Sequence, residues 1–283
     1  MTAGPRRYAE VPGEDAEEPL AGGDVTEGVV RRGRTVRRPL GPHSPVVHAV
    51  LDHLEGVGFD GAPRFLGVDD AGREVLTFVE GEVAGRPWPA WVADEGRLVS
   101  LARLVRRLDD ALAGLGVPEG LVPPAEEPPG IPQPLGPTPV ILGHGDVTPE
   151  NVVWRDGEAH ALIDFDLTRP CAPLDEVLSV LLWWAPLMPE QDRPEVLRGV
   201  DAFARTRIVV DAYGLDADSR RELLPAALRM TDRSWHLMRH RAATLGGGWA
   251  RMWDDGVGDR IRRRAAWLDA HAEQLRAALD EPR

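Results

Sequence analysis

The chain has 283 residues, enough for one large two-lobed unit or two average domains. Hydrophobic residues make up 43% and charged residues 28%, a composition that excludes a wholly disordered, collagen-like or coiled-coil chain. The basic residues, 33 in all against 46 acidic ones, give a net charge of −13, and every one is arginine. Such a surface repels nucleic acids and anionic membranes and favours a cationic small molecule. The lack of lysine excludes every lysine-based mechanism.

The single cysteine, Cys171, excludes an intramolecular disulfide and a cysteine-rich metal site, and it indicates a reducing cytoplasm. The longest nearly apolar run, 177–188, is shorter than the roughly 20 residues that a membrane helix needs. No apolar block follows the first arginines, so no signal peptide is expected. We instead expect residues 1–20 to form a flexible acidic tail.

The first hundred residues are expected to form strands and one helix. Short β-prone pieces around Gly28 and Gly33 predict hairpin strands over 25–38. Ser44 before Pro45 is typical of a helix N-cap, and apolar residues then follow one helix face: Val47, Val50, Leu51 and Leu54. Two more strand-like runs, 63–68 and 74–79, flank a turn.

The rest of the chain is expected to become helical. Apolar residues recur at three and four over 88–115, which predicts a helix. Residues 116–139 contain nine prolines and should form an extended connector. Three short strands, 140–142, 151–155 and 159–163, precede a chain that is helical from Leu174, with breaks near 186–194, 213–218 and 245–248. This order predicts an α+β fold.

The residues with the clearest chemistry are His144-Gly145-Asp146-Val147-Thr148-Pro149-Glu150-Asn151, followed by Ile163-Asp164-Phe165-Asp166. Phosphoryl transfer from ATP needs one carboxylate that faces the acceptor hydroxyl, and a second carboxylate with an amide oxygen that face Mg²⁺. Asp146, Asp164 and Asn151 supply this set. Surface turns also collect Asp and Asn for conformational reasons. The whole constellation, after a strand-rich half and before a helical one, favours the chemical interpretation.

His-Gly-Asp-x4-Asn with Ile-Asp-Phe-Asp resembles the aminoglycoside phosphotransferase and choline-kinase-like branch of the protein-kinase-like fold, over about residues 22–280. The resemblance implies a two-lobed α+β fold that binds ATP between a strand-rich N-lobe and a mainly helical C-lobe. It implies that Asp146 positions or deprotonates the acceptor hydroxyl and that Asn151 and Asp164 bind Mg²⁺. His144 would be a packing residue.

The same resemblance implies further roles and boundaries. The strand 76–79 resembles the hinge, so backbone groups of Phe78, Val79 and Glu80 would bind adenine. Asp175, at the start of a buried helix, would steady the catalytic loop. The expected lobes are residues 21–81, which bind the nucleotide, and 82–283, which carry the catalytic loop and the substrate-binding helices.

The N-terminal half departs from the family pattern, which places a lysine on the third strand and its glutamate partner on the next helix. Arg37 or Arg38 must replace the lysine, and alternation puts them on opposite faces of the strand. The spacing to the helix favours Arg37. The helix offers only Asp52 and Glu55, opposite its apolar stripe, so no partner is assigned. The glycine-containing stretch before the strands could cover the phosphates: Gly22, Gly23, Thr26 and Gly28.

The predicted function is ATP- and Mg²⁺-dependent phosphorylation of a hydroxyl group on a small molecule, with aminoglycosides as the family's emblematic substrates. Two alternatives stay open: a catalytically weak kinase-like protein that binds a nucleotide or a toxin, as in self-immunity, and a housekeeping kinase of an amino alcohol or sugar. The missing lysine pair favours the first alternative, and the intact Asp146, Asn151 and Asp164 oppose it. The acceptor and the oligomeric state have no signal in the sequence.

Overall fold

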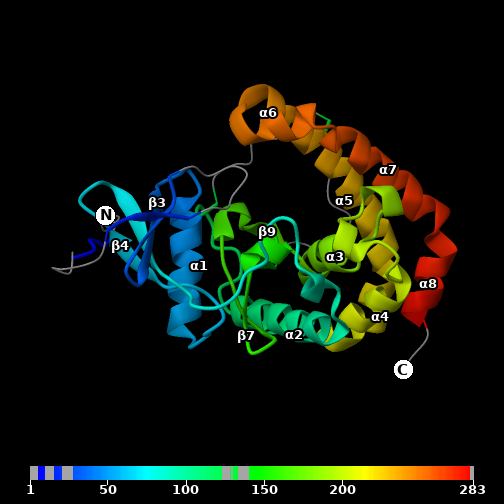
Figure 1. The fold of residues 1–283 in the computed structure, drawn as a ribbon, viewed down its shortest axis with the longest axis horizontal. Coiled ribbons are helices and arrows are strands. Elements are labelled where there is room, and N and C mark those ends of the chain that lie inside the picture. Colours follow the sequence, from blue (N-terminus) through cyan, green and yellow to red (C-terminus); the bar gives the residue numbers. More distant parts are fainter. Residues whose placement is uncertain are drawn as a thin grey trace.

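The computed structural model describes residues 6–9, 16–20, 28–122, 128, 130–132 and 140–280 of the chain. It begins with a five-stranded antiparallel sheet and one helix, and it continues as a mainly helical part (Figure 1). This order confirms the α+β class that the sequence predicted.

The N-terminal sheet has the strand order β1-β2-β3-β5-β4. Its strands are β1 (Glu18–Pro19), β2 (Val30–Arg32), β3 (Thr35–Pro39), β4 (Phe65–Val68) and β5 (Arg73–Thr77). Arg38 of β3 lies directly opposite Glu74 of β5, whereas Arg37 lies opposite Val75. Because directly opposed residues share a face of the sheet, this register gives Arg38 an acidic neighbour across the strands.

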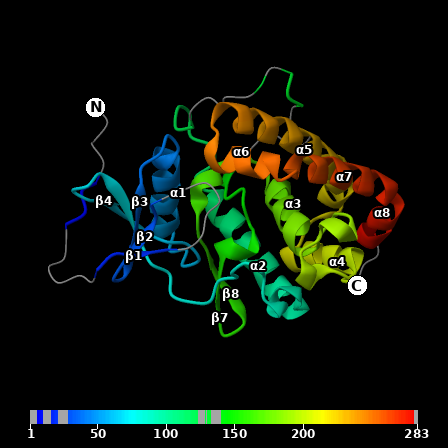
Figure 2. The same cartoon turned by 45° about the horizontal axis from the view of Figure 1, so that its top comes forward.

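Helix α1 (Ser44–Gly56) lies between the sheet and the middle of the chain in both views (Figures 1 and 2). Its buried apolar face follows the predicted spacing, with Val46, Val47, Val50, Leu51 and Leu54. Ser44 is not the N-cap that we predicted, because His43 occupies that position. The Ser44 hydroxyl instead accepts a hydrogen bond from the Gly41 N–H at 2.9 Å.

The chain leaves the sheet at Gly81, where it passes close to β7 (Val152–Arg155). A Cβ at Gly81 would lie 2.6 Å from the Trp154 carbonyl oxygen, and φ is +149°, so only glycine fits. Glu82 and Trp154 then exchange two backbone hydrogen bonds, of 2.9 and 2.7 Å. The passage from sheet to helices therefore lies beside residue 81, which we keep as the proposed lobe boundary.

The helix predicted over 88–115 is shorter and divided. A 3₁₀ turn, η1 (Ala90–Ala93), precedes α2 (Glu95–Leu112). The break falls at Asp94, whose side chain caps α2 by accepting a hydrogen bond from the Arg97 N–H at 2.8 Å. The predicted leucine face of α2 is buried in the core.

Short strands and turns follow α2 and carry the acidic residues of interest. The three predicted strands are confirmed as β6 (Ile141–Gly143), β7 and β8 (Glu158–Leu162). A fourth, β9 (Arg169–Cys171), pairs with β6 and was not predicted, because Arg-Pro-Cys lacks a strand pattern. Two 3₁₀ turns, η2 (Pro149–Asn151) and η3 (Phe165–Leu167), lie next to β7 and after β8.

The remaining chain is helical, with the three predicted breaks and further ones at 255–256 and 271 that were not predicted. Its elements are α3 (Pro173–Trp184), η4 (Glu190–Asp192), η5 (Glu195–Leu197), α4 (Ala202–Tyr213), α5 (Ala217–Thr244), α6 (Gly247–Asp254), α7 (Val257–Ala270) and α8 (Ala272–Asp280). Helix α6 extends from this part back toward α1 (Figures 1 and 2). None of the helices in the described ranges is long and apolar enough to cross a membrane.

Two segments near the N-terminus differ from the flexible tail expected over residues 1–20. The Val68 N–H donates to the Arg6 carbonyl at 2.8 Å, and Arg73 pairs with Glu17 at 2.7 Å. Residues 6–9 therefore lie along β4, and 16–20 include β1. The rest of that tail, most of the proline-rich connector and three members of the expected phosphate-covering turn, Gly22, Gly23 and Thr26, lie outside the described residues.

Candidate active site

The loop over 144–151 brings Asp146 and Asn151 into direct contact. The Asn151 side chain donates from Nδ2 to the Asp146 carbonyl oxygen and to Asp146 Oδ2, both at 3.0 Å. Both donations use the amide nitrogen, so the amide oxygen of Asn151 is directed elsewhere. One loop therefore presents a carboxylate and an amide oxygen, which is the pair of groups that the spacing predicted.

Asp146 has the electrostatics of a weak base. Its pKa is raised to about 6, chiefly by burial and further by the nearby carboxylates of Asp164 and Glu150. The hydrogen bond from Asn151 opposes this shift. At neutral pH the carboxylate is ionised but much more basic than an exposed aspartate, which suits it to accept a proton from a hydroxyl group.

Asp164 lies at the turn between β8 and η3. Its backbone is left-handed, with φ of +64°, a conformation that aspartate tolerates better than most residues. The side chain is 38% exposed and forms an ion pair with Arg38 Nη1 at 3.2 Å. Burial and the neighbouring Asp166 raise the pKa of Asp164, while Arg38 opposes them.

Two buried side chains anchor the 144–151 loop: His144, at its start, and Glu176, on α3. The fully buried His144 lies 2.9 Å from the Ile163 carbonyl, and its Nδ1 accepts from the Asp146 N–H at 3.2 Å. Burial lowers its pKa to about 4, so the ring is neutral. Glu176 Oε1 accepts from the Gly145 N–H at 2.9 Å. A Cβ at Gly145 would collide with Arg169 and Leu167, so the close approach requires glycine.

The sequence assigned the supporting acid to Asp175, and the structure corrects this by one residue. Asp175 accepts a hydrogen bond from the Ala172 N–H at 2.9 Å and thereby caps α3. Glu176, the next residue and completely buried, points the other way and reaches the loop. Because consecutive helix residues are 100° apart, only one of the two acids can face the loop.

The arginine that faces the acids is Arg38, which corrects our preference for Arg37. Arg38 Nη1 lies 3.2 Å from Asp164 and 2.7 Å from Asp166, and its Nε lies 2.7 Å from Glu74. Burial alone would lower the pKa of Arg38, but Asp166, Glu74 and Asp164 outweigh it and raise that pKa.

Arg37 points to the opposite face of the sheet. It is completely buried, pairs with Asp69 at 3.4 Å and lies over the Tyr8 ring at 5.0 Å. Alternation along the strand was the right principle. The choice of face was wrong because the position of α1 was inferred from chain spacing without the β3–β5 register.

The residues that could hold Mg²⁺ have suitable donors. Mg²⁺ prefers oxygen ligands and usually completes its shell with water and phosphate oxygens. Asn151 offers its amide oxygen and Asp164 a partly exposed carboxylate. Within the described ranges, no group of three or more His, Cys, Asp and Glu side chains forms a metal site by itself. The donor set fits a metal that also binds a nucleotide.

The expected hinge lies directly after β5. The Phe78 N–H donates to the Arg34 carbonyl at 2.8 Å, which continues the β3–β5 pairing. Arg31 lies over the Phe78 ring at 3.8 Å and pairs with Glu80 at 3.0 Å, and the Glu80 carbonyl accepts from Arg155. Within the described residues, no hydrogen bond engages the Val79 N–H. No hydrogen bond engages the Glu80 N–H in that part of the structure either.

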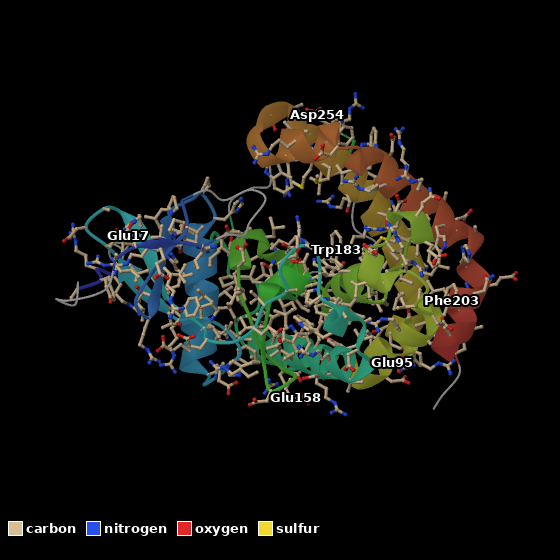
Figure 3. All side chains as sticks on the ribbon, in the orientation of Figure 1. Glu17, Glu95, Glu158, Trp183, Phe203 and Asp254 are labelled. Carbon is tan, nitrogen blue, oxygen red and sulfur yellow. The ribbon has the colours of Figure 1, made fainter. Side chains whose placement is uncertain are left out.

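Aromatic and basic side chains contact Glu150 of the 144–151 loop. Glu150 accepts from Trp88 Nε1 at 2.8 Å and also binds Arg86. Trp88 meets Trp183 edge to face with 6.4 Å between ring centroids, and Arg264 lies over Trp183 at 5.6 Å. Figure 3 places Trp183 near the centre of the molecule.

Three further arginines, Arg169, Arg233 and Arg241, lie near one another in this part of the chain. Arg169 donates to the Gly145 carbonyl at 3.3 Å, next to Asp146. Burial, Arg169 and Arg233 lower the pKa of Arg241, so the guanidinium of Arg241 is repelled by the other two. The charge beside Asp146 is therefore mixed, because Arg169 lowers the pKa of Asp146 while Asp164 and Glu150 raise it.

Several of these residues were missed by the sequence analysis. Glu74 was overlooked because the partner of the arginine was sought only on the helix. Both segments were predicted as strands, but their pairing was not; that pairing places Glu74 opposite Arg38. Glu176, Asp166 and Arg169 lay within or beside quoted motifs, but nothing in their spacing shows which way they point.

Comparison with known proteins identifies the family. A model described as the phosphotransferase enzyme family matches residues 123–213, which contain Asp146, Asn151 and Asp164. Over 272 residues the chain is 31% identical to the trifolitoxin immunity protein of Rhizobium leguminosarum bv. trifolii, covering 92% of this chain and 97% of that protein. The chain belongs to the phosphotransferase enzyme family. The resemblance stated from the sequence is thus confirmed.

Solved structures place this family member in the kinase-like fold. A choline/ethanolamine kinase family protein from Mesorhizobium loti has a TM-score of 0.52 and 16% identity, over 95% of this chain and 89% of that one. The gentamicin complex of APH(2″)-IIa gives 0.55 and 12%, over 93% and 94%. Amicoumacin kinase with AMP-PNP, Ca²⁺ and its ligand gives 0.56 and 13%, over 93% and 90%. The predicted two-lobed kinase-like fold is therefore confirmed.

Proposed function

We propose that this protein is an ATP- and Mg²⁺-dependent phosphotransferase that acts on a hydroxyl group of a small molecule in the cytoplasm. The observation that carries the proposal is the contact of Asn151 with Asp146 on one loop, opposite an Asp164 carboxylate bound by Arg38. Members of this fold that were solved with AMP-PNP or with gentamicin support it.

In this proposal each residue has one task. Asp146 Oδ2 is held by Asn151, so Oδ1 accepts the hydrogen of the acceptor hydroxyl. As the acceptor oxygen forms its bond to the γ-phosphorus, the bond to ADP breaks and the hydroxyl proton passes to Asp146. Asn151 and Asp164 would hold Mg²⁺, which supplies charge neutralisation on the phosphates when bound. Arg38 would bind phosphate oxygens, and the backbone of Phe78, Val79 and Glu80 would bind adenine.

The acceptor is proposed to lie against Trp88 and Trp183. The net charge of −13 favoured a cationic acceptor, whereas Arg169, bound to the Gly145 carbonyl next to Asp146, does not. An ATP-consumption screen should therefore include cationic, neutral and anionic hydroxylated molecules, among them gentamicin, choline and ethanolamine. A product that gains a phosphate with the wild type but not with Asp146→Asn supports the proposal. No turnover with any acceptor, and no MgATP binding, would overturn it.

A second candidate function is immunity to a toxic peptide or metabolite. It is favoured by the identity of 31% with a trifolitoxin immunity protein and by the absence of lysine from the site. The test is survival of a trifolitoxin-sensitive strain that expresses either the wild type or Asp146→Asn. Equal protection by both proteins would indicate binding without transfer, whereas protection lost in Asp146→Asn would indicate phosphorylation.

A further inference from the structure

The guanidinium of Arg38 is held by a chain of hydrogen bonds that begins on α1. Arg38 Nε donates to Glu74 Oε1 at 2.7 Å, and the other carboxylate oxygen, Oε2, lies 2.6 Å from His48 Nε2. Glu74 is 1% exposed, so Arg38 and His48 engage its two carboxylate oxygens inside the protein. The ring plane of His48 is fixed as well, because it stacks on Phe65 with centroids 3.5 Å apart and an angle of 9°.

The two acids of α1 are occupied elsewhere. Asp52 pairs with Arg6 at 3.0 Å, and Glu55 pairs with Arg64 at 3.5 Å, both in partly exposed positions. The helix therefore sends no carboxylate toward Arg38. Its contribution on that side is His48, and the carboxylate comes from β5 instead.

We infer that His48 is a positioning residue, which acts through Glu74 to fix the direction in which Arg38 presents its guanidinium to the nucleotide phosphates. The inference rests on the proposed function and adds to it the residue that supports Arg38. Because a carboxylate can only accept hydrogen bonds, His48 carries its hydrogen on Nε2 and donates it to Glu74. That donation holds the carboxylate in the plane that receives Arg38 Nε.

Without this support, two other acids compete with Glu74 for the Arg38 guanidinium. Arg38 Nη1 already lies 3.2 Å from Asp164 and 2.7 Å from Asp166. Together these two carboxylates attract it toward the proposed Mg²⁺ ligand Asp164. A Glu74 carboxylate that is free to rotate would hold Nε less firmly. The guanidinium could then follow these two acids and leave the orientation that phosphate binding needs.

The test compares MgATP affinity, by calorimetry, among variants of the full chain. His48→Phe keeps a flat ring on Phe65 but removes the donor, and we expect it to weaken MgATP binding about tenfold, the effect of one lost charged hydrogen bond. His48→Gln keeps a donor at a similar reach and should recover most of the affinity. If His48→Phe does not fold, His48→Leu takes its place.

A matched control is available on the same helix. His53 Nε2 lies 2.9 Å from the Ala111 carbonyl, away from the arginine, so His53→Leu should change melting temperature without changing MgATP affinity. In an Arg38→Ala background, His48→Phe should produce no further loss, because its effect passes through that arginine.

The outcomes separate this inference from the proposed function. If the wild type binds no MgATP, the proposed function fails and the inference fails with it. If the wild type binds MgATP and His48→Phe binds it as tightly as His53→Leu does, only the inference is overturned. Equal losses from His48→Phe with and without Arg38 would also overturn it, since His48 would then act by another route.

Discussion

Asn151 binds one side-chain oxygen of Asp146, and the other oxygen is proposed to accept the hydrogen of the acceptor hydroxyl. We therefore expect Asp146→Asn to reduce phosphoryl transfer by about 10²- to 10⁴-fold, the usual contribution of a positioned base. MgATP affinity should stay within about twofold of the wild type. Single-turnover rates and calorimetric titration measure the two quantities separately, and near-normal turnover in Asp146→Asn would refute the assignment.

The raised pKa of Asp146 is itself measurable. Titration of the nucleotide-free protein by carboxyl NMR should show a midpoint at about 6, with the signal identified by its absence in Asp146→Asn. Transfer should fall as the pH drops below that midpoint, since only the ionised form accepts a proton. Glu150→Gln removes one of the charges that raise this pKa, so it should move the midpoint to lower pH. A midpoint near 4 in the wild type would contradict this account.

Arg37 and Arg38 allow a direct comparison of two neighbouring charges. Arg38→Ala should weaken MgATP binding by roughly 1.5–3 kcal/mol, because it removes a charged contact to phosphate. Arg37→Ala should instead lower the free energy of unfolding, because it removes the buried arginine from Asp69 and leaves that carboxylate with the partly exposed Arg73 as its ion-pair partner. Urea unfolding and MgATP titration of both variants distinguish these effects. The opposite pattern would restore the original preference for Arg37.

At the scale of an element, helix α3 supports the 144–151 loop through the side chain of Glu176. Glu176→Ala removes the acceptor of the Gly145 N–H and should cost about 2–3 kcal/mol of folding stability, together with most of the activity. Asp175→Ala removes only a helix cap, which costs about 1 kcal/mol. Chemical denaturation and turnover of the two variants decide whether the support comes from Glu176.

The sequence predicted secondary-structure elements better than it predicted the direction in which individual side chains point. The spacing of Val47, Val50 and Leu54 was enough to predict α1, and the Asp-x4-Asn spacing was enough to predict that one loop carries both Asp146 and Asn151, but not that the two side chains touch. Which of two adjacent residues faces the site was assigned wrongly at both Arg37 and Asp175. Adjacent residues differ only through the register of a strand or the rotation of a helix, and tertiary packing sets both.

At the scale of the whole molecule, net charge and local charge differ. The chain carries −13 overall, yet Arg169 donates a hydrogen bond to the Gly145 carbonyl, next to Asp146. Electrostatic attraction at long range depends on the first quantity, and discrimination among bound acceptors depends on the second. Composition alone could therefore suggest a cationic partner but could not describe the site.

The sheet with α1 and the helical part both supply residues to the proposed nucleotide site, so bound MgATP should stabilise the whole chain. A ligand present at 100 times its Kd adds about 2.7 kcal/mol to the free energy of unfolding. We expect a rise of several degrees in melting temperature for the wild type and for Asp146→Asn, whose proposed role concerns the acceptor. Asp164→Ala should show a much smaller rise, because it loses a proposed metal ligand.

ATP with excess chelator is the control and should have little effect on any of the three proteins. An equal rise for Asp164→Ala and the wild type would mean that Asp164 does not hold the metal, while no rise in any of the three would remove the nucleotide from the proposed function.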